Sequence, residues 1–183
     1  MNIIKTEFEG LLILEPKVFE DHRGFFMESY NKQLLSDNGI LIDFVQDNQS
    51  KSTHGVLRGL HFQNPPNAQT KLVRVLQGRI IDGVVDIRKS SKTYGKSFSI
   101  ELSAENKRQL LVPKGFAHGF SVLSETAEIL YKCDAFYNKE SEGGLMYNDP
   151  AFNLDWGLTE NEVILSDKDQ VYKPFSEFNT KFQ

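Results

Sequence analysis

The strongest constraint on the fold of this chain is a series of short β-type segments, each ended by a turn signal. Glycine and proline, such as Gly78, Gly95 and the pair Pro65–Pro66, separate several of these segments. The segments span residues 10–16, 25–30, 43–50, 55–63, 71–78, 79–88, 96–103, 108–113, 118–124 and 127–133. One short helix is predicted over residues 31–38, capped by Asn31 and ended by Gly39. Many strands with few helices predict an all-β sandwich or barrel.

Length and composition fit one domain in the cytoplasm. The chain has 183 residues, of which 39% are hydrophobic and 25% charged, so we expect residues 1–183 to form a single domain. A net charge of −4 argues against nucleic acid as a partner, because phosphate binding needs a dense basic face. We expect no membrane span and no signal peptide. The single cysteine, Cys133, excludes an internal disulfide, which also favours the cytoplasm.

The segment VLRGLHFQ (56–63) places two ionisable residues in what otherwise resembles a buried strand. Strict alternation puts Arg58 and His61 on opposite faces, and neither face is purely polar. Gly59 lies between them and permits a bulge or twist that would turn both side chains inward. Taken alone, a buried histidine is more often structural, and Arg58 could be a surface charge on an edge strand.

Alternation also predicts that polar side chains of later strands face the interior. In residues 127–137 the uncharged face carries Tyr131 and Tyr137, and in residues 116–122 the apolar face carries His118. Tyr131 could be an ordinary core aromatic or, beside a basic group, a general acid. Unpartnered ionisable groups are costly to bury, so such a grouping indicates a water-containing cavity that binds a ligand.

Lys71 and Asp169 complete the set of candidate groups. Lys71 is either surface charge or, with Arg58, a cation that stabilises a diphosphate or a developing oxyanion. The segment LSDKDQ (165–170) offers Asp167 and Asp169; a charged tail is normally solvated, but an aspartate could fold back to hold an imidazole. Spacing alone does not establish that pairing.

A metal site is not expected. The segment PKGFAH (113–118) has the spacing of a second cupin motif, but LHFQ (60–63) has Gln63 where the first motif would have a second histidine. The available histidines and carboxylates do not form a convincing ligand set for a first-row metal. The sequence therefore predicts a cupin-like barrel without a metal.

Segments spread along nearly the whole chain resemble the dTDP-4-dehydrorhamnose 3,5-epimerase family. They are FEDHRGFFMESYN (19–31), FVQDNQSKS (44–52), GVLRGLHFQ (55–63), KLVRVLQG (71–78), LSAENKRQLLVPKGFAHGF (102–120), ILYKCDAFY (129–137) and LSDKD (165–169). The resemblance implies a cupin-like jelly-roll barrel with a few short helices and a C-terminal segment that folds back onto the active site. It also implies a homodimer without metal or organic cofactor, acting in dTDP-L-rhamnose biosynthesis. The expected reaction inverts C3 and C5 of dTDP-4-dehydro-6-deoxy-D-glucose.

The same resemblance assigns roles by position. It implies His61 as the base, Asp169 as its orienting carboxylate, Tyr131 as the acid and Lys71 as the stabiliser of the enolate. The residues expected to bind substrate are Arg23, Glu28, Gln46, Asn48, Arg58, His118, Tyr137, Glu142 and Lys168. Arg23 is expected to reach across the dimer interface, and Tyr137 to stack on thymine.

Small departures from the family pattern and three rival functions remain. Met27, Gln49 and Gly83 stand where other residues are common in the family, and none is a proposed catalytic residue. A metal-dependent cupin oxygenase would need the missing histidine pair. A sugar-nucleotide binding module would not need a base, its carboxylate and an acid together. A mono-epimerase or keto-isomerase of a related 4-keto sugar could use much the same cavity.

Overall fold

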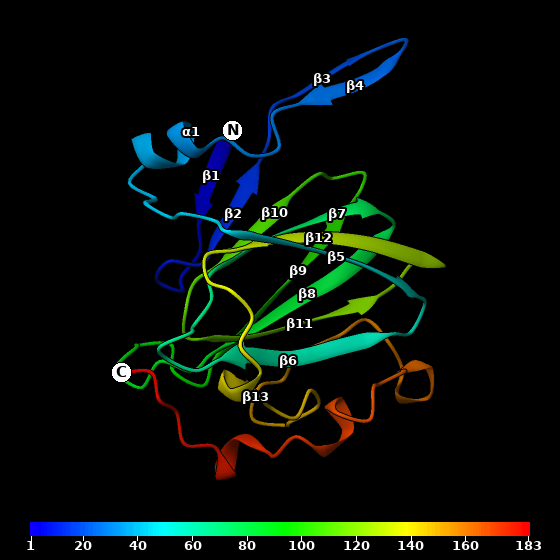
Figure 1. Ribbon diagram of the computed structural model, residues 1–183. Coiled ribbons are helices and arrows are strands. Elements are labelled where there is room, and N and C mark those ends of the chain that lie inside the picture. Colours follow the sequence, from blue (N-terminus) through cyan, green and yellow to red (C-terminus); the bar gives the residue numbers. More distant parts are fainter.

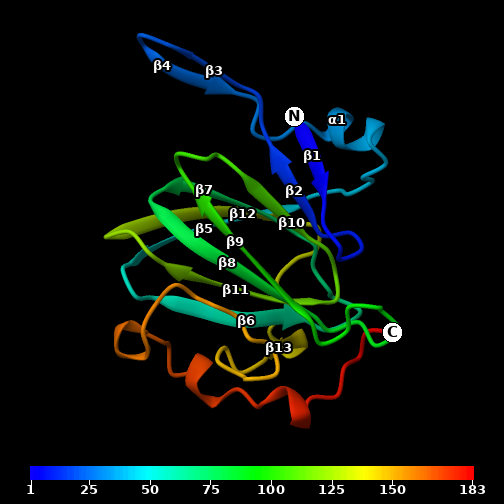
Figure 2. The ribbon, with the colours of Figure 1, turned by 180° about the vertical axis from the view of Figure 1, so that it is seen from behind.

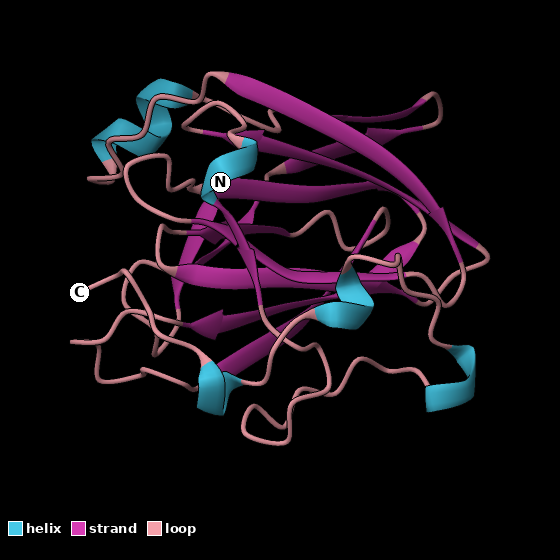
Figure 3. Cartoon of the chain, turned by 60° about the horizontal axis from the view of Figure 1, so that its bottom comes forward, coloured by secondary structure: helices cyan, strands magenta, loops and turns pink.

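The computed structural model describes residues 1–183 and is built from two antiparallel β-sheets that face one another (Figure 1). The strands of the first sheet run in the order β1-β2-β10-β7-β12-β5. The second sheet has the order β13-β6-β11-β8-β9, and β3 and β4 form a separate hairpin. This arrangement confirms the predicted all-β jelly roll, with helical turns confined to the periphery (Figure 3).

The elements have the following bounds. The strands are β1 (Asn2–Lys5), β2 (Leu12–Glu15), β3 (Val18–Asp21), β4 (Gly24–Met27), β5 (Gln46–Thr53), β6 (Leu57–Gln63), β7 (Lys71–Gln77), β8 (Arg79–Asp86), β9 (Ser97–Ser103), β10 (Gln109–Val112), β11 (Phe116–Val122), β12 (Thr126–Cys133) and β13 (Glu142–Gly144). The helical elements are α1 (Lys32–Asp37) and the 3-10 turns η1 (Lys139–Ser141), η2 (Glu160–Glu162), η3 (Asp169–Val171) and η4 (Phe175–Glu177).

Apolar side chains fill part of the space between the two sheets. Val73 and Ile129 from the first sheet pack with Val84, Leu102 and Phe120 from the second, and all five are buried. Burying such side chains contributes roughly 1.5–3 kcal/mol each to folding, so this contact holds the sheets together. The remaining interior is left for polar side chains.

Each sheet is also covered on its outer face. Helix α1 lies over the first sheet, where Leu35 packs against Leu14, Leu72 and Leu111. The predicted cap is confirmed, since the Asn31 side chain accepts a hydrogen bond from the Leu34 amide. Residues after 144 run beneath β6 and β13 (Figures 1 and 2) and bury Leu57, Leu60 and Phe62 from outside. The outer faces of β6 and β7, which carry site residues, are therefore supported from behind.

Strand boundaries differ from the sequence prediction in a few places. β5 runs over Gln46–Thr53 rather than 43–50, because the chain before it packs on the outer face of the first sheet through residues such as Phe44. β4 ends at Met27, short of the predicted end at residue 30. β1, β3 and β13 were not predicted; β13 has the sequence EGG, and it forms by pairing with β6 rather than by propensity.

The bulge predicted at Gly59 is confirmed by the pairing of β6 with β11. Arg58 pairs with Phe120 and His61 with His118, so two residues of β6 lie opposite one residue of β11. Gly59 has φ +135, and its Cα lies against Gly119 of β11. Past the bulge, Leu60 and Phe62 stay on the outer face, while His61 and the exposed Arg58 both line the space between the sheets.

The β3–β4 hairpin stands away from the two sheets (Figures 1 and 2). Its residues Phe19, Phe25 and Phe26 expose 54%, 57% and 69% of their surface. Large apolar side chains clustered on a projecting element are typical of a surface that meets another molecule.

No helix of the structure is both long enough and apolar enough to cross a membrane.

We expect the bulge to tolerate no side chain at Gly59. A Cβ there would lie 2.5 Å from the Gly119 Cα, whereas Gly24 has nearly the same backbone, φ +129, with no atom within 4 Å of a Cβ. Gly59→Ala should therefore lower the free energy of unfolding by about 3–5 kcal/mol, and Gly24→Ala by only about 1–2 kcal/mol. Urea denaturation at one fixed protein concentration measures both. Equal losses would show that the close approach of β6 and β11 is not tight.

Candidate active site

The interior opens into two adjoining compartments between the sheets. The outer one has a volume of about 360 Å³ and the inner one about 180 Å³. His61, Lys71 and Tyr131 line both compartments, so these three residues stand at the junction. His61 lies on β6 of one sheet, whereas Lys71 and Tyr131 lie on β7 and β12 of the other. A ligand at the junction would thus lie between opposing walls.

His61 and Asp169 form a hydrogen-bonded pair at this junction. The His61 Nε2 atom bonds the Asp169 Oδ1 atom, and the Ser166 hydroxyl donates to Oδ2 at 2.9 Å. Burial alone would raise the pKa of Asp169, but the contact with His61, the Ser166 hydroxyl and the Lys168 charge together lower it. Asp169 is therefore ionised at neutral pH and leaves the His61 Nδ1 atom as the unpaired ring nitrogen. Asp167, the alternative carboxylate, is exposed.

Lys71 is an amine in a largely desolvated position. Burial lowers its pKa, while Cys133, Asp82 and Glu142 act through space in the opposite direction. Its Nζ atom lies 5.9 Å from the centroid of the Tyr131 ring. A lysine with a lowered pKa gives up a proton or shares it in a hydrogen bond more readily than an exposed one.

Tyr131 faces the interior, as alternation along β12 predicted, and lines both compartments. Burial raises the pKa of its hydroxyl, and the Arg58 guanidinium only partly opposes this shift. The hydroxyl therefore keeps its proton at neutral pH. Cys133, two residues further along the same face, is fully buried, and burial raises the pKa of its thiol.

His118 and Arg58 line the inner compartment together with Ser50. The His118 Nε2 atom contacts both carboxylate oxygens of buried Asp82, at 2.9 and 3.0 Å, which fixes the ring. The Arg58 Nε atom donates to the Ser52 hydroxyl at 3.2 Å. That bond leaves the two terminal nitrogens of the guanidinium free to meet an anion.

The inward face of β5 is polar along its length. Gln46 and Asn48 line the outer compartment, and the Gln46 side chain bonds the Asn48 Oδ1 atom at 2.9 Å. The Gln46 Oε1 atom accepts from the Tyr137 amide at 3.1 Å, which holds Tyr137 at the rim. Amide side chains can donate to phosphate and accept from sugar hydroxyls, so this edge strand suits a polar ligand.

Tyr137 does not point into the barrel, contrary to the sequence prediction. β12 ends at Cys133, so alternation no longer applies at residue 137, and the side chain is 57% exposed at the rim of the outer compartment. Glu142 lies on the same rim and forms an ion pair with Lys168 at 2.7 Å. Lys168 itself lies behind Glu142 and lines neither compartment.

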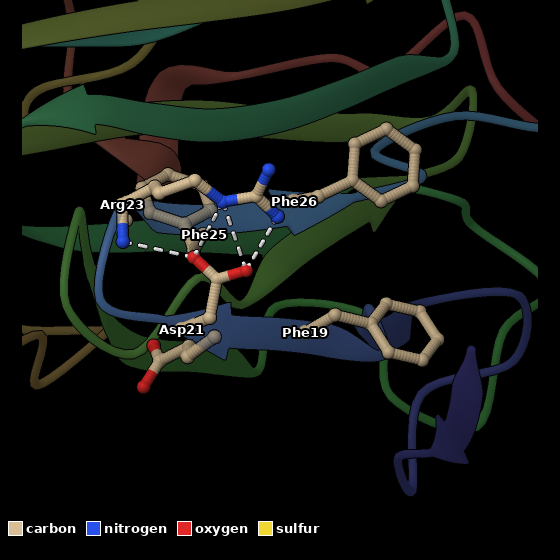
Figure 4. A pocket seen from close by; sticks show the side chains of 7 residues that line it. Phe19, Asp21, Arg23, Phe25 and Phe26 are labelled. Atoms are coloured by element: carbon tan, nitrogen blue, oxygen red, sulfur yellow. Dashed lines mark hydrogen bonds and ion pairs between the residues drawn. The ribbon is translucent and has the colours of Figure 1, made fainter.

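Arg23 and Glu28 are predicted site residues that the single chain leaves on or beside the β3–β4 hairpin, apart from the cavity. Arg23 lies at the tip of the β3–β4 hairpin and pairs with Asp21 at 2.6 Å, beside Phe19, Phe25 and Phe26 (Figure 4). Glu28 follows β4 and accepts from Asn31 at 2.8 Å. Neither lines the compartments that hold His61.

Sequence reasoning missed several residues that shape the site. Asp82 fixes His118, Ser166 fixes Asp169, and the Tyr172 ring lies 5.7 Å from the His61 ring. The charge of Asp82 in the apolar run IIDGVV was a usable signal, because a lone carboxylate there needs a partner. Nothing in the sequence marked Tyr172, which lies in a tail without regular strands.

Known proteins share both the sequence and the fold of this chain. The family model described as dTDP-4-dehydrorhamnose 3,5-epimerase matches residues 5–177. A relative named dTDP-4-dehydrorhamnose 3,5-epimerase from Shigella flexneri is 56% identical over 170 residues, covering 92% of this chain and 93% of the relative.

Solved structures agree with the sequence match. The crystal structure of dTDP-4-dehydrorhamnose 3,5-epimerase from Elizabethkingia anophelis NUHP1 is 53% identical, with a TM-score of 0.93 and 98% of each chain covered. The dTDP-6-deoxy-D-glucose-3,5-epimerase of Legionella pneumophila Philadelphia 1, solved in complex with dTDP-4-keto-L-rhamnose, is 49% identical. Its TM-score is 0.92, and the match covers 97% of this chain and 94% of that one. The chain therefore belongs to the dTDP-4-dehydrorhamnose 3,5-epimerase family.

Proposed function

We propose that this protein is an isomerase that inverts C3 and C5 of dTDP-4-dehydro-6-deoxy-D-glucose, giving dTDP-4-dehydro-L-rhamnose for dTDP-L-rhamnose biosynthesis. The observation that carries the proposal is the meeting of His61, Lys71 and Tyr131 at the junction of the two compartments, with Asp169 behind His61. Family membership supplies the substrate class.

His61 serves as the base. Both C3 and C5 flank the C4 ketone, so removal of a proton from either carbon gives an enolate. Because Asp169 accepts the Nε2–H, the Nδ1 lone pair is the one available to take that proton. The ionised carboxylate of Asp169 then stabilises the imidazolium that forms, as an orienting third group does in other relays.

Lys71 stabilises the enolate oxygen. Its ammonium lies at the junction in a position where burial strengthens electrostatic interactions. General acid–base catalysis contributes typically ~10²–10⁴-fold, which is roughly 3–5 kcal/mol. Stabilisation of the enolate by Lys71 and positioning by the cavity are expected to supply the rest of the barrier reduction.

Tyr131 returns the proton on the opposite face. Inversion requires that the proton leave one face of the sugar ring and return to the other. Tyr131 lies on the first sheet and His61 on the second, so the two groups approach a sugar held between them from opposite sides. The raised pKa of the Tyr131 hydroxyl keeps it protonated and ready to donate.

The outer compartment receives the dTDP group. Gln46 and Asn48 offer donors for the diphosphate there, and the exposed Tyr137 ring at the rim can stack on thymine. Arg58 and His118 hold the sugar end from the inner compartment. Glu142 and its ion-pair partner Lys168 complete this end of the site.

A second copy of the chain completes the site. The exposed phenylalanines of the β3–β4 hairpin need a covering surface, and Arg23 beside them pairs only with Asp21 of the same hairpin. In a two-fold symmetric dimer each hairpin would bring Arg23 and Glu28 to the partner's outer compartment.

We further propose that residues 1–183 act as one domain. The packing of the C-terminal segment on β6 supports this proposal. We also propose that the protein works in the cytoplasm.

Rival functions are separated by the chemistry of the junction. A binding module would gain nothing from a base, a paired carboxylate and an acid in one cavity. A cupin oxygenase would need a metal-binding cluster, and no group of three or more metal-ligating side chains is found. A mono-epimerase or keto-isomerase is the nearest rival, because the same groups could serve one carbon.

We expect the protein to exchange deuterium into both C3 and C5 when it is incubated with dTDP-4-dehydro-6-deoxy-D-glucose in D₂O. His61→Ala should lose at least about 10²-fold in exchange rate while retaining its fold by circular dichroism. NMR or mass spectrometry of the sugar measures uptake at each carbon. Uptake at C3 alone would indicate a mono-epimerase, and no uptake by folded protein would refute the proposed activity. Retained exchange in His61→Ala would remove His61 from the role of base.

We expect Arg23 to act in the partner's site, which mixed dimers can test. Arg23→Ala and His61→Ala should each be impaired alone. A dimer of one chain of each kind contains one site with both native residues, because the His61→Ala chain supplies its Arg23 to the other chain. Co-expression at equal levels should therefore restore about a quarter of wild-type activity, since about half of the dimers are mixed. Activity no higher than that of the separate variants would place Arg23 in its own chain's site.

A further inference from the structure

Tyr172 is an aromatic residue beside the proposed base that does not line either compartment. It follows η3, whose first residue, Asp169, holds the His61 Nε2 atom. The ring centroids of Tyr172 and His61 lie 5.7 Å apart with an interplanar angle of 66°, an edge-to-face contact. One short segment thus touches the imidazole in two ways, through a carboxylate and through an aromatic ring.

The Tyr172 ring packs on the backbone of Gly144. In β13, Gly144 pairs with His61 of β6, so the two residues are direct neighbours across the sheet. A Cβ on Gly144 would lie 2.2 Å from the Tyr172 Cζ atom and 2.4 Å from both Cε atoms. The end of the ring therefore rests on the bare backbone of Gly144, in space that a side chain there would occupy.

The surroundings hold Tyr172 in this place. The Met146 amide donates to the Lys173 carbonyl at 3.1 Å, which ties the residue after Tyr172 to the chain that follows β13. The Tyr172 hydroxyl is buried and makes no hydrogen bond of ordinary geometry, but it lies close to the Lys168 side chain, which lowers its pKa against the rise that burial causes. The ring itself is held by its packing on Gly144 and His61.

We propose that Tyr172 is a positioning residue, whose ring is clamped between Gly144 and the His61 imidazole and sets the plane of that imidazole. The imidazole turns about its Cβ–Cγ bond, and a single hydrogen bond at Nε2 restrains that torsion only weakly. The edge contact with the Tyr172 ring restricts it further. With both contacts in place, the Nδ1 atom is held toward the junction with Lys71 and Tyr131. This inference rests on the proposed role of His61 as base.

The ring and the hydroxyl of Tyr172 can be tested separately. Tyr172→Phe keeps the ring, so kcat for exchange should stay within about twofold of wild type. Tyr172→Leu removes the aromatic contact, so kcat should fall by about 10–100-fold. KM should change by less than about threefold in both, because Tyr172 does not line the cavity. Tyr94→Leu is the matched control, since Tyr94 packs on Phe175 rather than on His61, and its kcat should not change.

A second test uses the contact with Gly144. Gly144→Ala should displace the ring and lower kcat to about the level of Tyr172→Leu. In the Tyr172→Leu background the same change should have little further effect, because the ring it displaces is already absent. Additive losses in the double variant would show that Gly144 and Tyr172 act independently, and would overturn the proposal.

NMR without substrate separates this inference from the proposed function. The Nε2–H proton of His61, bonded to Asp169, should give a slowly exchanging downfield signal in the wild type and in Tyr172→Phe, identified by its absence in His61→Ala. In Tyr172→Leu the signal should broaden or vanish. If the wild type proves inactive but the signal follows this pattern, the function is wrong and the positioning role stands. An unchanged signal, an unchanged kcat in Tyr172→Leu, or an equal loss in Tyr172→Phe would each overturn the positioning role.

Discussion

The close approach of Gly59 to Gly119 is the constraint on which the site depends. With no side chain on either glycine, β6 can bulge against β11, and two residues of β6 fit opposite one residue of β11. The extra residue returns His61 to the face that already carries Arg58, while Leu60 and Phe62 stay packed under the C-terminal segment. In a regular strand without the bulge, His61 would leave the cavity, or Leu60 and Phe62 would lose their apolar contacts on the outer face.

The two sheets carry different catalytic groups. The second sheet contributes His61, and the first contributes Lys71 and Tyr131. Burial shifts the last two in useful directions: it lowers the pKa of the Lys71 ammonium and raises that of the Tyr131 hydroxyl. The same desolvation that is costly to folding thereby prepares one group to stabilise an enolate and keeps the other protonated.

Local signals predicted much of this arrangement, and tertiary contacts account for the rest. Turn residues and alternation predicted most strands, the cap at Asn31 and the inward orientation of His118 and Tyr131, because each depends on neighbours in sequence. The partner of His118, Asp82, depends on the register of β8 with β11, which no spacing reveals. Tyr172 meets His61 only because an irregular tail folds back, and the exposure of Tyr137 follows from where β12 ends.

The central claim is that base and acid act on the sugar from opposite sheets. The most direct test is NMR analysis of the sugar formed in D₂O by Tyr131→Phe, with configuration and deuterium content determined at C3 and C5. Loss of the acid alone should slow inversion by about 10²-fold or more, while His61 continues to exchange protons for deuterium from its own side. Deuterium should therefore enter with retained configuration. Inversion at both carbons at the wild-type rate would contradict the account.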